Sequence, residues 1–131
     1  MANDTSYKVF LVDDDTFLLN MYSLKFTKNH FEVTTAQNGN EALKKIKDGY
    51  TPDIILLDVI MPGLDGLGLL DAIRKEKLVP KATVVMLTNE SNSVEIEKAK
   101  NLGIAGYIVK ATTIPSEVVD DVIEIHKKHN A

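Results

Sequence analysis

The sequence predicts an α/β fold in which a five-stranded parallel sheet is covered by five helices. Short apolar segments rich in β-branched residues alternate five times with segments whose apolar residues recur at helical spacing. The connections between them are only a few residues long, which implies right-handed crossovers and helices on both faces of the sheet. The 131 residues suit a single domain, and we expect residues 1–131 to form it without a linker or a second domain.

The composition indicates a globular domain and argues against several classes of protein. The hydrophobic content of 44% and the charged content of 26% are typical of a soluble globular domain. A net charge of −4 argues against a broad nucleic-acid-binding surface. The absence of cysteine excludes disulfides and thiolate chemistry, and no apolar segment approaches the roughly 20 residues of a membrane span. We therefore expect a cytoplasmic protein that binds neither nucleic acid nor membrane directly.

The first half of the chain contains two strands and two helices. Residues 7–12 form a β-prone segment that ends in three aspartates. A helix follows up to about Lys28. Its expected apolar stripe consists of Phe17, Met21 and Leu24, flanked by Leu18 and Phe26. After a short break, a second strand covers residues 31–36, and a second helix starts at residues 38–41 and stops at Gly49.

The centre of the chain carries the most apolar strand. Residues 54–57 are all isoleucine or leucine, run directly into Asp58 and are bounded by turn residues. This pattern is typical of a strand buried on both faces. The next helix starts after Gly66 and ends near Lys77, and residues 82–88 form another strand of the buried type.

The last third of the chain repeats the pattern. A helix rich in glutamate and lysine has a weak apolar stripe and ends at Gly103, and we expect it to be the most mobile helix. Residues 104–109 form a fifth strand that runs into Lys110. Pro115 opens the last helix, and we expect its polar end, residues 126–130, to fray.

Polar side chains follow four of the five strands. They are Asp13, Asp14 and Asp15 after the first strand, Asp58 after the third, Thr88 after the fourth and Lys110 after the fifth. Because the carboxyl ends of parallel strands lie at one edge of a sheet, we expect these groups to converge. Taken singly, an aspartate here is as readily a turn or helix cap.

The combination of these groups points to a particular chemistry. Carboxylates this close either have raised pKa values or recruit a cation, and oxygen ligands alone favour Mg²⁺ over zinc. Phosphoryl transfer to a carboxylate uses such parts, with an aspartate as nucleophile and with a metal and a lysine that neutralise the phosphoryl oxygens.

The chain resembles the receiver domains of two-component response regulators over about residues 7–128. The residues that carry the resemblance are the acidic pair Asp13-Asp14, Asp58 with the following Met61-Pro62-Gly63 and Asp65-Gly66, Thr88, and the segment Gly106-Tyr107-Ile108-Val109-Lys110. The resemblance implies a flavodoxin-like fold with strand order 2-1-3-4-5. It also implies a signalling domain rather than an enzyme.

The resemblance assigns roles at the acidic cluster. Asp58 is the expected phosphoacceptor, and a histidine kinase or a histidine phosphotransfer protein is the expected donor. Asp14, Asp58 and the backbone carbonyl of Ile60 are the expected ligands of Mg²⁺, and Asp13 positions the ion through water.

The resemblance also implies a switch. Thr88 and Lys110 are expected to contact the phosphoryl group, and Tyr107 is the expected aromatic switch residue. The face formed by the fourth helix, fifth strand and fifth helix would then bind an unidentified downstream protein, and the phosphorylated protein could form a homodimer. In one departure from the family, Ala111 stands where a proline in a cis peptide is usual, and we expect a trans peptide here.

Three other functions use some of the same parts. A phosphatase of the haloacid-dehalogenase type also has an aspartate nucleophile after a strand, but Phe17 occupies the signature position of a threonine or valine. A flavin-binding module shares the fold, but the three aspartates would repel the flavin phosphate. A receiver-like adaptor that only binds partners is the third alternative. The residues do not distinguish a stand-alone regulator from one domain of a larger protein.

Overall fold

The computed structural model of the protein describes residues 7–59, 63–88, 93–110 and 113–130. Within these residues, strands and helices alternate in the predicted order. The strands are β1 (Lys8–Val12), β2 (Glu32–Ala36), β3 (Ile54–Asp58), β4 (Thr83–Thr88) and β5 (Gly106–Val109). The helices are α1 (Thr16–Lys28), α2 (Gly39–Lys47), α3 (Gly66–Lys75), α4 (Ser93–Asn101) and α5 (Pro115–His129).

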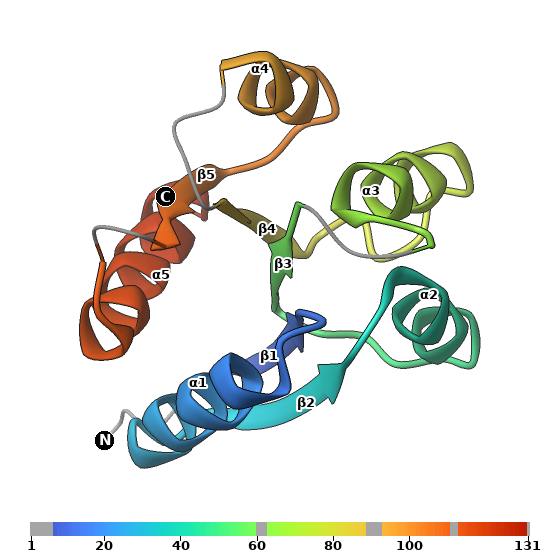
Figure 1. Ribbon diagram of the computed structural model, residues 1–131. Coiled ribbons are helices and arrows are strands. Elements are labelled where there is room, and N and C mark those ends of the chain that lie inside the picture. The colour runs from blue at the N-terminus through green and yellow to red at the C-terminus, as the bar shows by residue number, and fades with distance from the viewer. Residues whose placement is uncertain (1–6, 60–62, 89–92, 111–112, 131) are drawn as a thin grey trace.

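The five strands form one parallel sheet in the order β2-β1-β3-β4-β5, which confirms the predicted topology. Strand β3 lies at the centre, and all of its residues are buried, as expected for an unbroken apolar segment. Helices α1 and α5 cover one face of the sheet, and α2, α3 and α4 cover the other (Figure 1). All strands therefore end at one edge of the sheet, and all helices end at the opposite edge.

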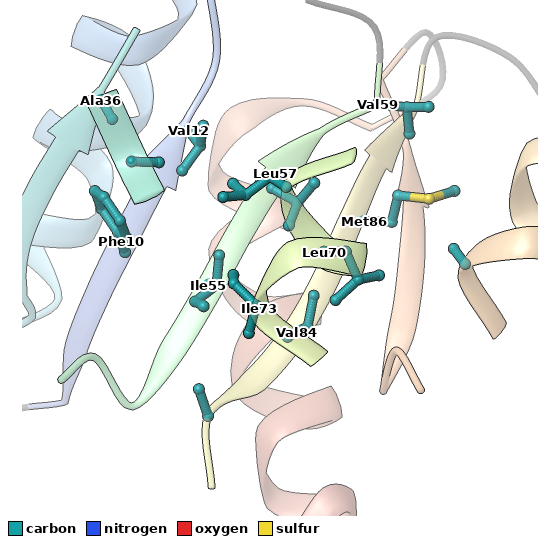
Figure 2. Close-up of a cluster of buried hydrophobic side chains, with 14 of the residues drawn as sticks. Phe10, Val12, Ala36, Ile55, Leu57, Val59, Leu70, Ile73, Val84 and Met86 are labelled. Atoms are coloured by element: carbon teal, nitrogen blue, oxygen red, sulfur yellow. The ribbon is translucent and has the colours of Figure 1, made fainter. Parts of the chain in front are cut away.

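Side-chain alternation along the strands divides the core into two layers. The strand residues that face α2, α3 and α4 are Phe10, Val12, Ala36, Ile55, Leu57, Val84 and Met86. Leu70 and Ile73 of α3 pack against this layer (Figure 2). The strand residues that face α1 and α5 are Val9, Leu11, Ile54, Leu56, Val85, Leu87 and Ile108. The same alternation determines on which side of the sheet each residue just past a strand lies.

The predicted apolar stripe of α1 is wrong, although the helix itself is confirmed. The buried side chains are Leu19, Tyr22 and Phe26. In contrast, Phe17 is 71% exposed and Leu24 is 62% exposed. The reason is that α1 has large apolar residues around most of its circumference, so the pattern does not select a face. The N-cap selects it: the Asp15 carboxylate accepts from the backbone N–H groups of Phe17 at 3.0 Å and Leu18 at 3.2 Å.

The predicted fraying at the end of α5 is also wrong. The helix continues to His129, and His126 is buried. His126 Nδ1 lies 2.7 Å from Thr83 Oγ1 and 3.1 Å from Asn130 Nδ2. The Tyr7 ring packs edge-on against the imidazole, with the ring centres 4.6 Å apart. These contacts anchor the end of α5 to the start of β4, a long-range arrangement that a polar sequence does not reveal.

Smaller differences occur at element ends. Helix α3 ends at Lys75, two residues before the predicted Lys77, whose φ is 54°. Strand β5 starts at Gly106 rather than at residue 104. The predicted glycine stops are confirmed, since Gly49 and Gly103 adopt φ values of 111° and 87°. In the described part of the chain, no helix has the length and apolar character to cross a bilayer.

We predict that His126 makes stability dependent on pH. Burial lowers the pKa of His126, and the negative charge of Asp53 partly offsets this shift. The unfolded chain then binds more protons below about pH 6.5, so the stabilisation that His126 provides is complete above that pH and is lost as the pH falls. His126→Gln should lower the free energy of unfolding at pH 7.5 by about 1–2 kcal/mol, with a smaller deficit at pH 5.5. Urea denaturation at both pH values measures this.

The matched control is His129→Gln, which alters an exposed histidine in the same turn of α5. It should change stability little at either pH. A deficit for His126→Gln that is equal at both pH values would contradict the predicted proton linkage.

Candidate functional site

Strand register and side-chain alternation bring Asp13, Asp58 and Lys110 to one corner of the sheet edge. The pairing of β1 with β3 ends at Val12 and Leu57, so the next residues, Asp13 and Asp58, lie side by side. On the other side, Asp58 pairs with Leu87 of β4. Leu87 pairs with Ile108 of β5, two residues before Lys110. Paired residues and residues two apart share a face, so all three charged side chains lie toward α1 and α5.

Lys110 forms ion pairs with two buried carboxylates. Its Nζ lies 2.9 Å from Asp13 Oδ2 and 3.3 Å from Asp58 Oδ1. The exposed fraction of the side chain is 10% for Lys110, 3% for Asp13 and 6% for Asp58. Removing charges from water is unfavourable unless they are paired. The predicted convergence of these three groups is therefore confirmed, and each depends on the others.

The acidic cluster has more negative charge than Lys110 neutralises. Carboxylate oxygens of Asp13, Asp14 and Asp58 lie within 4.8 Å of one another, and Asp14 is exposed. Asp13 Oδ1 accepts a hydrogen bond from the backbone N–H of Asp15 at 2.9 Å. Asp13 Oδ2 is buried and has the Lys110 ammonium as its partner, at 2.9 Å. Three carboxylates with one ammonium leave an excess of negative charge, and such a cluster of oxygen atoms suits a divalent cation that prefers oxygen ligands.

The electrostatic environment shifts the pKa values of the central pair. The pKa of Asp58 is raised from 3.8 to about 6. Burial is the largest cause, repulsion from Asp13 adds to it, and Lys110 opposes both effects. Burial by itself would lower the pKa of Lys110, but the hydrogen bond to Asp13 and the charge of Asp58 outweigh it, so the pKa is raised. At neutral pH the ammonium is charged and Asp58 is ionised, which is the nucleophilic form of a carboxylate.

The Asp65-Gly66 pair shapes the loop beside Asp58. The Asp65 carboxylate caps α3 by accepting from the backbone N–H of Gly68 at 2.8 Å. Gly66 N–H donates to the Val59 carbonyl at 3.0 Å. A Cβ atom at Gly66 would overlap the carbonyl oxygen of Asp58, so only glycine allows α3 to start this close to β3. The pair therefore shapes the loop and starts α3.

Thr88 and Tyr107 share one face of the sheet. Thr88 ends β4, is buried and pairs with Val109 of β5. Tyr107, two residues before Val109, pairs with Met86. Because Met86 belongs to the layer toward α2, α3 and α4, Thr88 and Tyr107 face that side. The Tyr107 side chain is 42% exposed and so lies outside the core.

Some predicted positions cannot be placed. Ile60, whose carbonyl is the expected metal ligand, lies outside the described residues, and so does Ala111 of the Lys110-Ala111 peptide.

Tyr22 of α1 is a neighbour of the site that the sequence did not predict. Burial raises the pKa of Tyr22, while the charge of Lys110 lowers it and those of Asp13 and Asp58 raise it. Its hydroxyl therefore lies within electrostatic range of the corner. Counting from the N-cap at Asp15 would have identified it, since residues seven apart share a side of a helix.

Comparison with known proteins identifies the family. A family model of the response regulator receiver domain matches residues 9–122. The chain belongs to this family. Receiver domains are signalling domains of two-component systems that take phosphoryl groups from kinases, and they are generally not enzymes.

Curated relatives of this receiver domain are longer proteins. It is 35% identical over 108 residues to "Probable transcriptional regulator ycf27" of Cyanidium caldarium and 36% identical over 103 residues to the protein of the same name from Pyropia yezoensis. The alignments cover 82% and 79% of the receiver domain but 42% and 41% of these relatives. The chain thus spans about two fifths of the length of the curated relatives it matches.

Solved structures share the fold of this receiver domain over nearly their whole length. The chemotaxis response regulator CheY4 of Vibrio cholerae superposes with a TM-score of 0.83 at 30% identity, covering 92% of this chain and 99% of that one. The receiver domain of the Francisella response regulator 1452 superposes with a TM-score of 0.80 at 31% identity, covering 94% and 98%. The similarity therefore extends beyond the site to the complete sheet and its helices.

We predict that Asp58→Asn stabilises the metal-free receiver domain at neutral pH. The raised pKa means that folding disfavours the ionised carboxylate, so the wild-type protein is destabilised above about pH 6. A rise from 3.8 to about 6 sets an upper limit of about 3 kcal/mol, and we expect about 1–3 kcal/mol. Denaturation in the presence of a chelator measures this at pH 7.5. The advantage should shrink as the pH falls toward 4, where Asp58 is protonated in the folded state.

Asp120→Asn, which changes an exposed carboxylate on α5, is the matched control and should be nearly neutral. If Asp58→Asn lowered stability at pH 7.5, the burial penalty on the Asp58 charge would not be the dominant effect.

Proposed function

We propose that this receiver domain accepts a phosphoryl group on Asp58 from a phosphohistidine of a histidine kinase or a histidine phosphotransfer protein. The observation that carries the proposal is the buried, ionised Asp58 carboxylate, which lies beside a charged Lys110 in a cluster of three carboxylates. A carboxylate held in this way is a nucleophile with a cation already in place for the transferred group.

The proposed reaction is an in-line displacement at phosphorus. An Asp58 oxygen attacks, and the bond between phosphorus and the donor imidazole nitrogen breaks. The electron pair of that bond stays on the imidazole nitrogen, which takes up a proton, and Asp58 becomes an acyl phosphate. The Lys110 ammonium, now 3.3 Å from Asp58 Oδ1, is within reach of the phosphoryl oxygens, and Thr88 at the end of β4 is the neighbouring hydroxyl.

Asp13, Asp14 and Asp58 suit Mg²⁺, with the carbonyl of Ile60 as a further expected ligand. When bound, the ion would supply positive charge for the phosphoryl oxygens. The close approach of the three carboxylates, within 4.8 Å of one another, and the exposure of Asp14 support this assignment.

We predict that a small-molecule phosphodonor with Mg²⁺ adds one phosphoryl group to the protein. Intact-mass spectrometry should detect the added group, and a chelator should prevent it. Asp58→Asn should abolish the modification, whereas Asp65→Asn, which changes the cap of α3, should retain it. A label that persists in Asp58→Asn would refute the assignment of the phosphoacceptor.

The exposed apolar side of α1 supports docking of a helical donor protein. Phe17 and Leu24 are seven residues apart and so lie on one side of the helix. Ile114 at the start of α5 is a third exposed apolar side chain, 60% exposed. Phe17 follows the Asp15 N-cap and is therefore next to the phosphoacceptor corner. A donor that covers α1 would thus present its histidine near Asp58.

We predict that Leu24→Asp slows phosphoryl transfer from a phosphohistidine protein by about tenfold or more, because it places a charge in an apolar contact. The rate with a small-molecule donor should not change, since that donor needs no docking surface. Val94→Asp on α4 is the matched control and should leave transfer unchanged. Rapid-quench kinetics measure the rates, and equal slowing with both donors would contradict the docking role.

We further propose that phosphorylation switches the face formed by α4, β5 and α5, where an unidentified downstream protein or a second copy would bind. Thr88 and Tyr107 face the same side of the sheet on paired strands. Movement of the Thr88 hydroxyl toward a phosphoryl group would open space into which the exposed Tyr107 ring could turn. Helix α4 buries little apolar surface, through Ile96 and Ala99, and is the element best able to adjust.

We predict that Thr88→Ala uncouples this switch. In the wild-type protein, a phosphoryl mimic should change NMR chemical shifts at Tyr107 and along α4. In Thr88→Ala the mimic should still bind, but most of those changes should be lost because the hydroxyl that follows the phosphoryl group is absent. Thr27→Ala, near the end of α1 and so at the opposite edge of the sheet, is the control. Full switching of Thr88→Ala would contradict the coupling.

We infer that residues 1–131 act as one receiver unit in the cytoplasm. The family match over residues 9–122 supports the single unit, and the two-component role supports the location.

A further inference from the structure

Basic residues are concentrated at the edge of the sheet opposite Asp58. Eleven lysines and arginines lie in the last turns of the five helices. Lys8 starts β1, and Lys77 and Lys81 lie in the loop between α3 and β4. Only Lys110, among the 15 lysines and arginines of the chain, lies at the phosphoacceptor edge. Lys44, Lys47 and Lys75 are paired with carboxylates, but basic residues outnumber acidic ones at this edge, so the base is net positive although the whole chain has a net charge of −4.

Helix dipoles explain part of this distribution but not the loop lysines. Positive side chains in a last turn stabilise the partial negative charge of the helix end. Lys77 and Lys81 lie beyond α3 and are exposed, and neither forms an ion pair with the described residues. The nearby carboxylates are already engaged. Glu76 pairs with Lys47 at 3.3 Å, and Asp53 accepts a hydrogen bond from the backbone N–H of Lys8 at 2.8 Å.

An apolar hollow of about 220 Å³ is lined by Lys81, in the loop that also contains Lys77. Its lining residues come from the loops that precede β3 and β4 and are Thr51, Pro52, Val79, Pro80, Lys81 and Ala82. The hollow is smaller than the roughly 300–1,000 Å³ typical of small-molecule sites. Its size suits one large apolar side chain.

The backbone around the hollow is strained. Val79 adopts a φ of 37°, in the left-handed region that β-branched residues rarely occupy. Ala82 N–H donates to the Val79 carbonyl at 3.0 Å, and Leu78 and Val79 pack against the core, which together maintain this conformation. The strain holds the Val79 side chain at the wall of the hollow, and strained backbone is concentrated at binding and functional sites.

We propose that this base is a docking surface for an acidic segment of a partner protein, which inserts one large aliphatic side chain into the hollow while its carboxylates contact Lys77 and Lys81. Charge complementarity selects an anionic partner. The apolar hollow between the loops selects a protein over nucleic acid, whose phosphate-rich surface has no aliphatic anchor. The surface is independent of phosphoryl transfer, because it lies at the opposite ends of the strands.

The test uses a short synthetic peptide in which glutamates and aspartates flank one leucine. Titration into the ¹⁵N-labelled protein should shift amide resonances of residues 51–53 and 77–83 and leave those near Asp58 unchanged. A peptide with alanine in place of leucine, and one with amides in place of the carboxylates, should each bind at least about tenfold more weakly. Equal binding of all three peptides would overturn the proposal.

Variants separate the lysines from the hollow. The double variant Lys77→Glu/Lys81→Glu should weaken peptide binding about tenfold or more. Thr51→Trp, which fills the hollow from an exposed rim position, should do the same. Lys25→Glu and Lys28→Glu, at the end of α1, are matched controls that should bind normally. Shifts spread evenly over all basic residues, or tighter binding to duplex DNA or anionic vesicles than to the peptide, would overturn the proposal. Phosphorylation of Asp58 should be normal in every variant.

Discussion

The buried ion pair of Lys110 with Asp13 and Asp58 is the interaction on which the organisation of the site depends. Three strands contribute to it, so it forms only after β1, β3 and β5 have taken their places in the sheet. A buried carboxylate without a partner is strongly destabilising, and two carboxylates with one ammonium still carry excess charge. The protein thus stores an unfavourable electrostatic state at Asp58, seen in the raised pKa. Such a carboxylate would gain more from the binding of a cation than an exposed one would.

The surrounding fold places the buried Asp58 carboxylate at the edge of the sheet. The apolar central strand β3 leads Asp58 to the edge of the sheet, and Gly66 allows α3 to approach within contact of its carbonyl. Asp15 and Asp65 cap the helices that start beside the site, so neither competes for Lys110. The acidic residues of this edge therefore divide into two groups, those that cap helices and those whose carboxylates cluster near Lys110.

The two edges of the sheet differ in charge for a common reason. In a parallel α/β fold, helix starts gather at the edge where strands end, and helix ends gather at the opposite edge. Favourable dipole interactions therefore attract acidic residues to one edge and basic residues to the other. At the edge where the strands end, Asp13, Asp14 and Asp58 form a cluster of carboxylates. At the base, helix dipoles do not explain the two loop lysines or the apolar hollow beside the strained Val79.

The sequence by itself determined the number, order and type of the elements, because apolar periodicity and glycine stops are local signals. It also determined that Asp13, Asp58 and Lys110 meet, because the ends of parallel strands share an edge. Tertiary structure decided which side of α1 is buried, since that helix has apolar residues on nearly every side and the Asp15 cap and the sheet select among them. It also decided that His126 is buried, because its partner Thr83 is 43 residues away and no local pattern encodes that contact. Local patterns define the elements, whereas burial depends on which surfaces meet after the chain has folded.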